Sequence, residues 1–299
     1  MGVPACDGRI GCLPIIHLDP AQPFDLGKTL SCGQVFRWER CGTRWYGVVG
    51  ERVLVVQQDG MRLRYQGAPE SFIRDYFQLD LDLPPILATI DRDPLIHASL
   101  HRCHGLRIIR QPAWECLASY ICATFANIPG IRHRIELLAQ SFGEPVRFEG
   151  KTYYGFPTPA ALASAEDCTV RACKVGYRAP YLCETARCIG EDPEFFGRID
   201  ELRYENARRE LLRLKGVGNK VADCVLLFAF QRYEAVPVDV WIGRILGTWY
   251  DAGPVKRTYS GLQQLARERF GEFAGYAQEY LFCDRYQIVQ GQSPKDRNR

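Results

Sequence analysis

Residues 216–224 read GVGNKVADC, and no other stretch of the chain restricts the range of possible folds as strongly. An amphipathic helical pattern ends near Leu214, and a second, more apolar helical pattern begins at Lys220. The two glycines in the short connection between these patterns let the backbone turn tightly. The stretch therefore predicts a helical hairpin over about residues 206–230.

The turn of this hairpin is also a candidate phosphate-binding site. Gly216 and Gly218 let the backbone approach a partner closely, and the free N–H groups that start the second helix, through Val221, point outward. Such groups together form a site that suits an anion. The alternative is a hairpin in which the glycines serve only to form the turn. The Gly-x-Gly pattern taken alone favours this alternative.

Lys220 is the candidate nucleophile of the chain. It lies at the N-terminal end of the second helix, where the helix dipole disfavours a cation and where helix packing would desolvate it. Both effects favour the neutral amine that nucleophilic catalysis requires. Cys224 follows four residues later, so the amine and a soft apolar surface would line one pocket. A solvated lysine at a helix start is the alternative.

Asp239 is the candidate catalytic carboxylate, within residues 236–242, VPVDVWI. Pro237 forces an extended entry, and Asp239 then stands at a helix N-cap. Plain capping, which contributes about 1 kcal/mol, is the alternative. The functional interpretation is a carboxylate that stabilises developing positive charge or moves protons.

Length and composition match an ordinary globular protein. The chain has 299 residues, of which 46% are hydrophobic and 24% charged, and this excludes a wholly disordered chain, collagen and a coiled-coil rod. No stretch approaches a membrane span and no secretory signal opens the chain, so we expect a cytoplasmic protein without a membrane partner, associated with the nucleoid if prokaryotic. A net charge of +3 still permits a local basic face for DNA.

The periodicity predicts an α+β fold, with an antiparallel sheet followed by a mostly helical body. Asp59-Gly60 between alternating apolar runs is a strong hairpin signal. We expect a β-rich domain over residues 1–109 and a helical domain over residues 110–299. The expected strands are 35–39, 45–49, 53–56, 61–65, 146–148 and 152–154. The expected helices are 71–78, 93–101, 113–125, 131–142, 159–164, 179–189, 204–214, 220–230, 240–250, 261–270 and 276–286.

The 13 cysteines are odd in number and scattered, which favours free buried thiols over a disulfide framework. Two pairs of cysteines, each separated by four residues, lack the second pair that a four-cysteine zinc site requires. Three histidines, with a cysteine next to one of them, have a spacing that could bind zinc. A polar helix face is the favoured interpretation of those histidines, and we expect no metal site. The residues concerned are Cys168, Cys173, Cys183, Cys188, His97, His101, His104 and Cys103.

Six segments of the chain form one ordered set of motifs. They are 31–38 (SCGQVFRW), 152–157 (TYYGFP), 176–179 (GYRA), 216–224, 236–239 (VPVD) and 277–282 (AQEYLF). Together they resemble the 8-oxoguanine DNA glycosylases of the helix-hairpin-helix superfamily. One GxGxK match would be weak, but six ordered segments are specific. The resemblance runs from about Phe24 to Tyr286, nearly the whole chain, and implies the helical body of that superfamily after the sheet.

The resemblance implies a bifunctional repair enzyme. Lys220 would attack the sugar C1′ as the damaged base leaves, and the resulting Schiff base permits β-elimination and strand nicking. Asp239 matches the family's catalytic aspartate. The implied partner is double-stranded DNA that contains oxidised guanine, and we expect a monomer that needs no cofactor.

The resemblance also implies a pocket for the lesion base. Gly33 matches the glycine whose carbonyl accepts the N7 proton that 8-oxoguanine has and guanine lacks. Cys224 and Phe282 match the two faces of the base sandwich, and Gln278 matches the reader of the Watson–Crick edge. Independently, Gln278 and Phe282 lie four residues apart on one helix face.

Tyr177 and Arg178 match the residues that wedge into the duplex and contact the orphaned cytosine. A wedge is needed because a base that flips out of the duplex leaves a gap in the stack. The chain departs from the family nearby. Phe125 replaces the asparagine that fills the vacated space, and Gly130 replaces an arginine at the opposite cytosine, so we expect a weaker preference for cytosine. Trp241 stands where many members have a histidine near the phosphate.

Related endonucleases carry an iron–sulfur cluster on four cysteines beyond the aspartate, but only Cys283 follows Asp239 here, so we expect no cluster. Three alternatives to the leading function stay open. They are a glycosylase of a different lesion range, such as alkylated or other oxidised purines, a non-catalytic binder of damaged DNA, and a thiol-based redox or metal protein.

Overall fold

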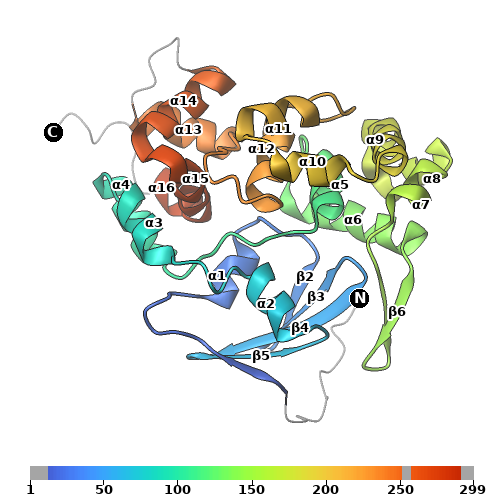
Figure 1. Cartoon of the computed structure of the whole chain (residues 1–299), viewed down its shortest axis with the longest axis horizontal. Helices are drawn as coiled ribbons and strands as arrows, with labels where there is room; N and C mark the ends of the chain where they lie inside the picture. The colour runs from blue at the N-terminus through green and yellow to red at the C-terminus, as the bar shows by residue number, and fades with distance from the viewer. Residues whose placement is uncertain (1–12, 251–256, 291–299) are drawn as a thin grey trace.

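The computed structural model describes residues 13–250 and 257–290, and it places a twisted sheet beneath a larger helical body (Figure 1). The sheet has five antiparallel strands in the order β1-β5-β4-β3-β2. The expected α+β class, with the sheet first and the helices after it, is confirmed. The strands are β1 (Ile15–His17), β2 (Trp38–Cys41), β3 (Arg44–Val49), β4 (Arg52–Asp59) and β5 (Arg62–Gln66).

Alternating apolar residues build the sheet and its own small core. Leu54, Val56 and Leu63 are fully buried, while the neighbouring turn at Asp59-Gly60 joins β4 to β5 as the sequence predicts. Gly60 has a φ of +55°, a conformation that other residues rarely adopt. The short helices α1 (Leu26–Ser31) and α2 (Glu70–Tyr76) close this core.

The strand expected at residues 35–39 begins only at Trp38, and Gln34 gives the reason. The buried Gln34 amide donates to the carbonyls of Thr29 and Arg107 at 2.9 and 2.8 Å and accepts from the Ile109 N–H at 2.9 Å. These bonds hold the backbone around Gln34 at the junction between the sheet and the helical body, so this backbone does not join the sheet. They also fix the position of the adjoining Gly33.

The helical body fills the upper half of Figure 1. Most predicted helices are present within a few residues of their expected ends, and the hairpin that interrupts them is β6 (Pro145–Phe148) with β7 (Lys151–Tyr154). The helices are α3 (Leu83–Ile90), α4 (Pro94–Arg102), α5 (Ala113–Cys122), α6 (Ile128–Phe142), α7 (Pro159–Ala163), α8 (Asp167–Val170), α9 (Ala179–Glu191), α10 (Phe195–Glu201), α11 (Tyr204–Leu211), α12 (Asn219–Phe228), α13 (Val240–Trp249), α14 (Tyr259–Phe270), α15 (Ala274–Cys283) and α16 (Arg285–Gln290). Single helical turns are η1 (Arg171–Val175), η2 (Gly176–Arg178) and η4 (Gly271–Phe273).

The helix expected at residues 276–286 is divided at Asp284, and this part of the prediction is wrong. The Asp284 carboxylate is buried, accepts from Ser99 Oγ at 2.8 Å and pairs with Arg102, both on α4. These contacts hold Asp284 outside helical geometry, with ψ near 0°. The chain therefore turns after α15, and α16 starts a new direction beside the cavity described below.

The helices α3 and α4 pack with the helical body, although they precede residue 109. Ile86, Ile96 and Leu100 belong to the large core that also contains α5, α12 and α15. The chain thus crosses from the sheet to the body and back before residue 109, and the division of the chain at 109/110 stays a prediction.

Free thiols are found at most of the described cysteines, but the expectation is wrong at Cys41, which is disulfide-bonded. Cys168 and Cys188 are exposed and not buried as expected. Among the described helices, none is both long and apolar enough to cross a membrane.

Candidate functional site

A cavity of about 220 Å³ opens between the turn after α1, the turn before α6, the start of α12 and the α15–α16 corner. It brings together the six residues predicted for catalysis and for the lesion base, which come from four separate parts of the sequence. These are Gly33, Lys220, Cys224, Asp239, Gln278 and Phe282.

The hairpin that carries Lys220 forms as predicted, from α11 and α12. Gly216 has a φ of +77°, and a Cβ atom there would lie 2.6 Å from the Cβ of Tyr181, so both conformation and packing require glycine. Gly218 is the N-cap of α12, and no side chain caps the helix. The N–H groups of its first turn, through the buried Val221, thus stay available for an anion. Lys220, in that same turn, is half-buried and lines the cavity.

Asp239 caps α13, as its position predicts. Its Oδ1 accepts a hydrogen bond from the Ile242 N–H at 2.8 Å. Among the described residues, none donates a hydrogen bond to the other oxygen, Oδ2. Because Asp239 also lines the cavity, capping and a role in chemistry do not exclude one another.

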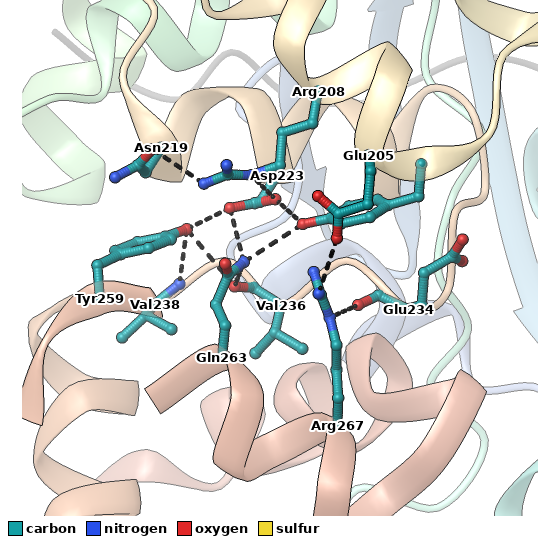
Figure 2. A network of polar contacts seen from close by, with 11 residues as sticks. Glu205, Arg208, Asn219, Asp223, Glu234, Val236, Val238, Tyr259, Gln263 and Arg267 are labelled. Atoms are coloured by element: carbon teal, nitrogen blue, oxygen red, sulfur yellow. Dashed lines mark hydrogen bonds and ion pairs between the residues drawn. The ribbon is translucent and has the colours of Figure 1, made fainter. Parts of the chain in front are cut away.

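A buried network around Asp223 connects the helix of Lys220 to the strand-like segment that leads to Asp239 (Figure 2). Asp223 accepts from Arg208 Nε at 3.0 Å, from Tyr259 Oη at 2.6 Å and from Gln263 Nε2 at 2.8 Å, and it also bonds to the Tyr204 hydroxyl. Burial raises the pKa of the Asp223 carboxyl, whereas the tyrosine hydroxyls and Arg208 lower it.

The same network holds the backbone that enters Asp239. Gln263 Nε2 donates to the Val236 carbonyl at 3.0 Å, and the Val238 N–H donates to the Tyr259 hydroxyl at 3.4 Å (Figure 2). Since Asp223 lies three residues after Lys220 and Val238 directly precedes Asp239, the network links the two backbone segments that carry the amine and the carboxylate.

The floor of the cavity at Gly33 is tightly packed. Gly33 has a φ of +116°, and a Cβ atom there would lie 3.0 Å from Ile128 Cδ1 and 3.1 Å from Phe282 Cε1. No described residue donates a hydrogen bond to the Gly33 carbonyl. Burial raises the pKa of Cys224, which therefore stays a neutral thiol, the soft surface expected from the sequence.

Helix α15 supplies one wall. The side-chain oxygen of Gln278 is buried and finds no hydrogen-bond partner among the described residues. The guanidinium of Arg285 lies 4.0 Å from the centre of the Phe282 ring and so covers one face of this ring. An unsatisfied amide and an apolar ring are what a flat, polar-edged ligand requires.

Phe125, Tyr177 and Arg178 form a second cluster at the rim of the cavity. The turn that carries Phe125 contributes its neighbours Ala123 and Ala126 to the cavity, while Phe125 itself is 97% exposed. Its φ of +48° is unusual for a bulky residue. Tyr177 is 48% exposed, and its hydroxyl lies 3.4 Å from Thr124 Oγ1.

Arg178 is not presented to a ligand as the resemblance implies. It is buried, its Nε donates to Thr124 Oγ1 at 3.0 Å, and its terminal nitrogens donate to the carbonyls of Thr124 and Val175. The guanidinium also lies over the Tyr177 ring, 4.4 Å from its centre. In this structure Arg178 braces the turn that carries Phe125 and Tyr177, and a base could use its donors only after a rearrangement.

Sequence reasoning missed Glu279, which lines the cavity and is 1% exposed. The signal was present, because an acidic residue on an otherwise apolar helix needs an explanation. Trp241, whose role the sequence left open, also lines the cavity and packs edge-on against Tyr286 at 5.2 Å.

The histidines on α4 are arranged as a hydrogen-bonded polar face. His97 Nδ1 lies 2.8 Å from Asp91 Oδ2, and the Nε2 atoms of His97 and His101 lie 3.1 Å apart. Within residues 13–250 and 257–290, no group of three or more histidine, cysteine or carboxylate side chains has the arrangement of a metal site.

Comparison with known proteins finds N-glycosylase/DNA lyases among the relatives of this chain. Residues 16–117 match the family model described as 8-oxoguanine DNA glycosylase, N-terminal domain. A probable N-glycosylase/DNA lyase of Methanothermobacter thermautotrophicus is 34% identical over 249 residues, which cover 74% of this chain and 78% of that protein. The N-glycosylase/DNA lyase of Saccharomyces cerevisiae is 32% identical over 250 residues, 73% of this chain and 66% of the yeast protein.

A solved structure gives the same result. The Clostridium acetobutylicum 8-oxoguanine glycosylase/lyase, in complex with double-stranded DNA containing cytosine opposite 8-oxoguanine, superimposes with a TM-score of 0.84 and 33% sequence identity. The match covers 90% of this chain and 93% of the clostridial chain. It therefore spans the sheet, the hairpin and the helical body together.

Proposed function

The chain belongs to the 8-oxoguanine DNA glycosylase family of the helix-hairpin-helix superfamily, and we propose that Lys220 and Asp239 carry out the family's reaction in it. The enzyme removes 8-oxoguanine from duplex DNA and cleaves the strand at the resulting abasic site. Its partner is DNA that contains the oxidised base.

In the proposed reaction the neutral amine of Lys220 attacks the sugar C1′, and the bond from C1′ to the base breaks as the base leaves with the bonding electrons. Asp239, which is half-buried and lines the same cavity, stabilises the positive charge that develops on the sugar. The attacking nitrogen loses a proton, the C1′–O4′ bond of the sugar breaks as O4′ takes up a proton, and the opened sugar is left as a Schiff base between the Lys220 nitrogen and C1′. Loss of a proton from the neighbouring carbon expels the phosphate and nicks the strand.

The cavity selects the base by its edge and its faces. The free carbonyl of Gly33 accepts the proton on N7 of 8-oxoguanine, and guanine would leave this carbonyl unpaired. Cys224 and Phe282 cover the two faces of the base, and the unpaired amide oxygen of Gln278 meets a donor on its Watson–Crick edge.

The rim and the hairpin hold the DNA around the extruded nucleotide. Phe125 and Tyr177 present exposed rings that can stack in the gap left by the base, which offsets part of the cost of unstacking. The open N–H groups between Gly216 and Val221 bind a backbone phosphate. Arg178 reaches the opposite base only if DNA binding releases it from Thr124.

One observation carries the proposal: a single cavity contains the amine, the carboxylate and the four base-facing groups, although they lie up to about 250 residues apart in sequence. A protein that only bound damaged DNA would not need the Lys220 amine in one cavity with the Asp239 carboxylate, whose second oxygen is unpaired among the described residues. The thiol-based alternative has no comparable support, because Cys224 is a buried neutral thiol.

Borohydride trapping tests the proposal. Reduction of the Schiff base should link wild-type protein covalently to a duplex that contains 8-oxoguanine, and Lys220→Gln should abolish the complex. Lys151→Gln is the matched control, since Lys151 is an exposed lysine on the β6–β7 hairpin, and it should trap like the wild type. Full trapping by Lys220→Gln would disprove the assignment.

Base preference is tested separately, by excision of 8-oxoguanine, other oxidised purines and an alkylated purine from otherwise identical duplexes. We expect 8-oxoguanine to be removed fastest. Preferential removal of the alkylated purine would favour the other lesion range.

A further inference from the structure

Glu279 is the one buried acidic side chain of the cavity that the reaction described above does not use. It lies on α15 between Gln278 and Phe282 and lines the cavity with them. Its Oε1 is buried and has no hydrogen-bond partner among the described residues. A buried carboxyl oxygen without a partner is costly, which indicates that a partner is supplied by something absent from the free protein.

The neighbours of Glu279 leave its Oε1 without a hydrogen-bond partner. The Cys32 thiol contacts the carboxyl and lowers its pKa, but this thiol also donates to the Thr29 carbonyl, 3.3 Å from Sγ. The Arg285 guanidinium donates to the carbonyls of Cys32 and Phe282, at 3.3 and 2.5 Å, and forms no ion pair with Glu279 in the described part of the chain.

These contacts place the carboxyl at the end of the cavity where Gly33 lies. Cys32, which Glu279 contacts, directly precedes Gly33, and Phe282, one helical turn after Glu279, packs against Gly33. A base that reaches the Gly33 carbonyl would therefore bring its N–H edge to Glu279.

We propose that Glu279 is a specificity-determining residue whose ionised carboxylate is a second hydrogen-bond acceptor, beside the Gly33 carbonyl, for the N–H groups of an oxidised purine. Guanine presents a lone pair at N7 where 8-oxoguanine presents N–H, so a carboxylate at this position attracts the lesion and repels the normal base. The inference rests on the proposed function, because it concerns the base that the same cavity holds.

The charge state of Glu279 makes the inference pH-dependent. The pKa of Glu279 is raised to about 7, chiefly by burial; the Cys32 contact and the Arg285 charge lower this pKa, and the Asp239 charge raises it. The carboxyl is therefore ionised, and able only to accept, above about pH 7, and becomes protonated as the pH falls. The titratable or charged groups that face it or share its cavity are Cys32, Tyr120, Lys220, Cys224, Asp239, Arg285 and Tyr286.

The test compares two reactions of one protein. Excision of 8-oxoguanine needs the base in the cavity, whereas cleavage of a preformed abasic site uses Lys220 without any base. We expect Glu279→Gln and Glu279→Met to reduce single-turnover excision by about 10- to 100-fold, the value of one hydrogen bond to a charged group, and to change abasic-site cleavage by less than about threefold.

The ratio of excision to abasic-site cleavage removes effects that are common to both reactions, because both use Lys220. In the wild type this ratio should rise as the pH increases through about 7, and in Glu279→Gln it should be flat. Glu272→Gln is the matched control, since Glu272 is exposed in the turn before α15, and it should keep the wild-type ratio and its pH profile.

Wild-type excision in both Glu279 variants over the whole pH range would overturn the inference. Equal loss of both reactions would also overturn it, because that result indicates a structural role. If the wild type itself neither excises the base nor cleaves the abasic site, the proposed function fails, and that outcome is distinct from a defect confined to the variants.

Discussion

The cavity and its rim are built in opposite ways. In the cavity, a buried network centred on Asp223 links the backbone segments that carry Lys220 and Asp239, and the base-facing groups come from α12, α15 and the turn after α1. At the rim, Phe125 and Tyr177 project into solvent from a turn that Arg178 braces.

The difference separates chemistry from DNA deformation. Groups that react with the sugar carbon act faster when they are already positioned before the substrate binds, because no free energy is then spent on positioning them during the reaction. Groups that enter a duplex must be exposed in the free protein, since their apolar surface is buried only against DNA. Changes in the cavity should therefore abolish chemistry, whereas changes at the rim should weaken the capture of duplex DNA.

The largest effect is expected from Asp239→Asn. Asparagine caps a helix as well as aspartate, so the free energy of unfolding should change by less than about 0.5 kcal/mol. Single-turnover excision should nevertheless fall by about 10²- to 10⁴-fold, because the carboxylate charge is lost. Asp25→Asn is the matched control, as Asp25 caps α1 away from the cavity, and its rate should stay within about twofold of the wild type. An active Asp239→Asn enzyme would reduce Asp239 to a helix cap.

A smaller effect is expected from Phe125→Gly. Loss of the ring should slow excision from duplex DNA by about 10- to 30-fold, since the stacking that offsets base extrusion is removed. Glycine tolerates the positive φ of this position, so the free energy of unfolding should change by less than about 1 kcal/mol.

Met61→Ala controls for loss of an exposed apolar side chain, because Met61 lies in the β4–β5 turn and is 44% exposed. It should excise like the wild type. Equal rates for Phe125→Gly and Met61→Ala would mean that the rim does not act as a wedge.

The smallest effect is expected from the base opposite the lesion. Gly130 offers no side chain to that base, and the Arg178 guanidinium is buried and bonded to Thr124 and Val175, so excision of 8-oxoguanine opposite the four bases should vary by less than about tenfold. Single-turnover rates on four matched duplexes measure this directly. A preference for cytosine of 100-fold or more would show that another group reads the opposite base.

The sequence predicted the cavity better than the rim, and the reason is physical. The hairpin at α11–α12 and the cap at Asp239 depend on local signals, namely glycine turns, an N-cap position and helical periodicity. The burial of Arg178 depends on Thr124, 54 residues away, and no local pattern records such a contact.

Some elements of the fold escaped prediction for equally specific reasons. No helix was expected at residues 83–90, where Pro84 and Pro85 occupy the first turn of α3, a position that tolerates proline because no N–H is needed. The division after α15 follows from the contacts of Asp284 with α4, which are set by tertiary packing. Glu279 was missed because its missing partner becomes apparent only when the surrounding helices are in place.

The most direct test of the account is to locate the covalent link. Wild-type protein is reduced with borohydride on a duplex that contains 8-oxoguanine, digested with a protease, and the DNA-bearing peptide is sequenced by mass spectrometry. The account predicts that the sugar remnant is attached to Lys220. A remnant on any other amine, with Lys220 unmodified, would contradict it.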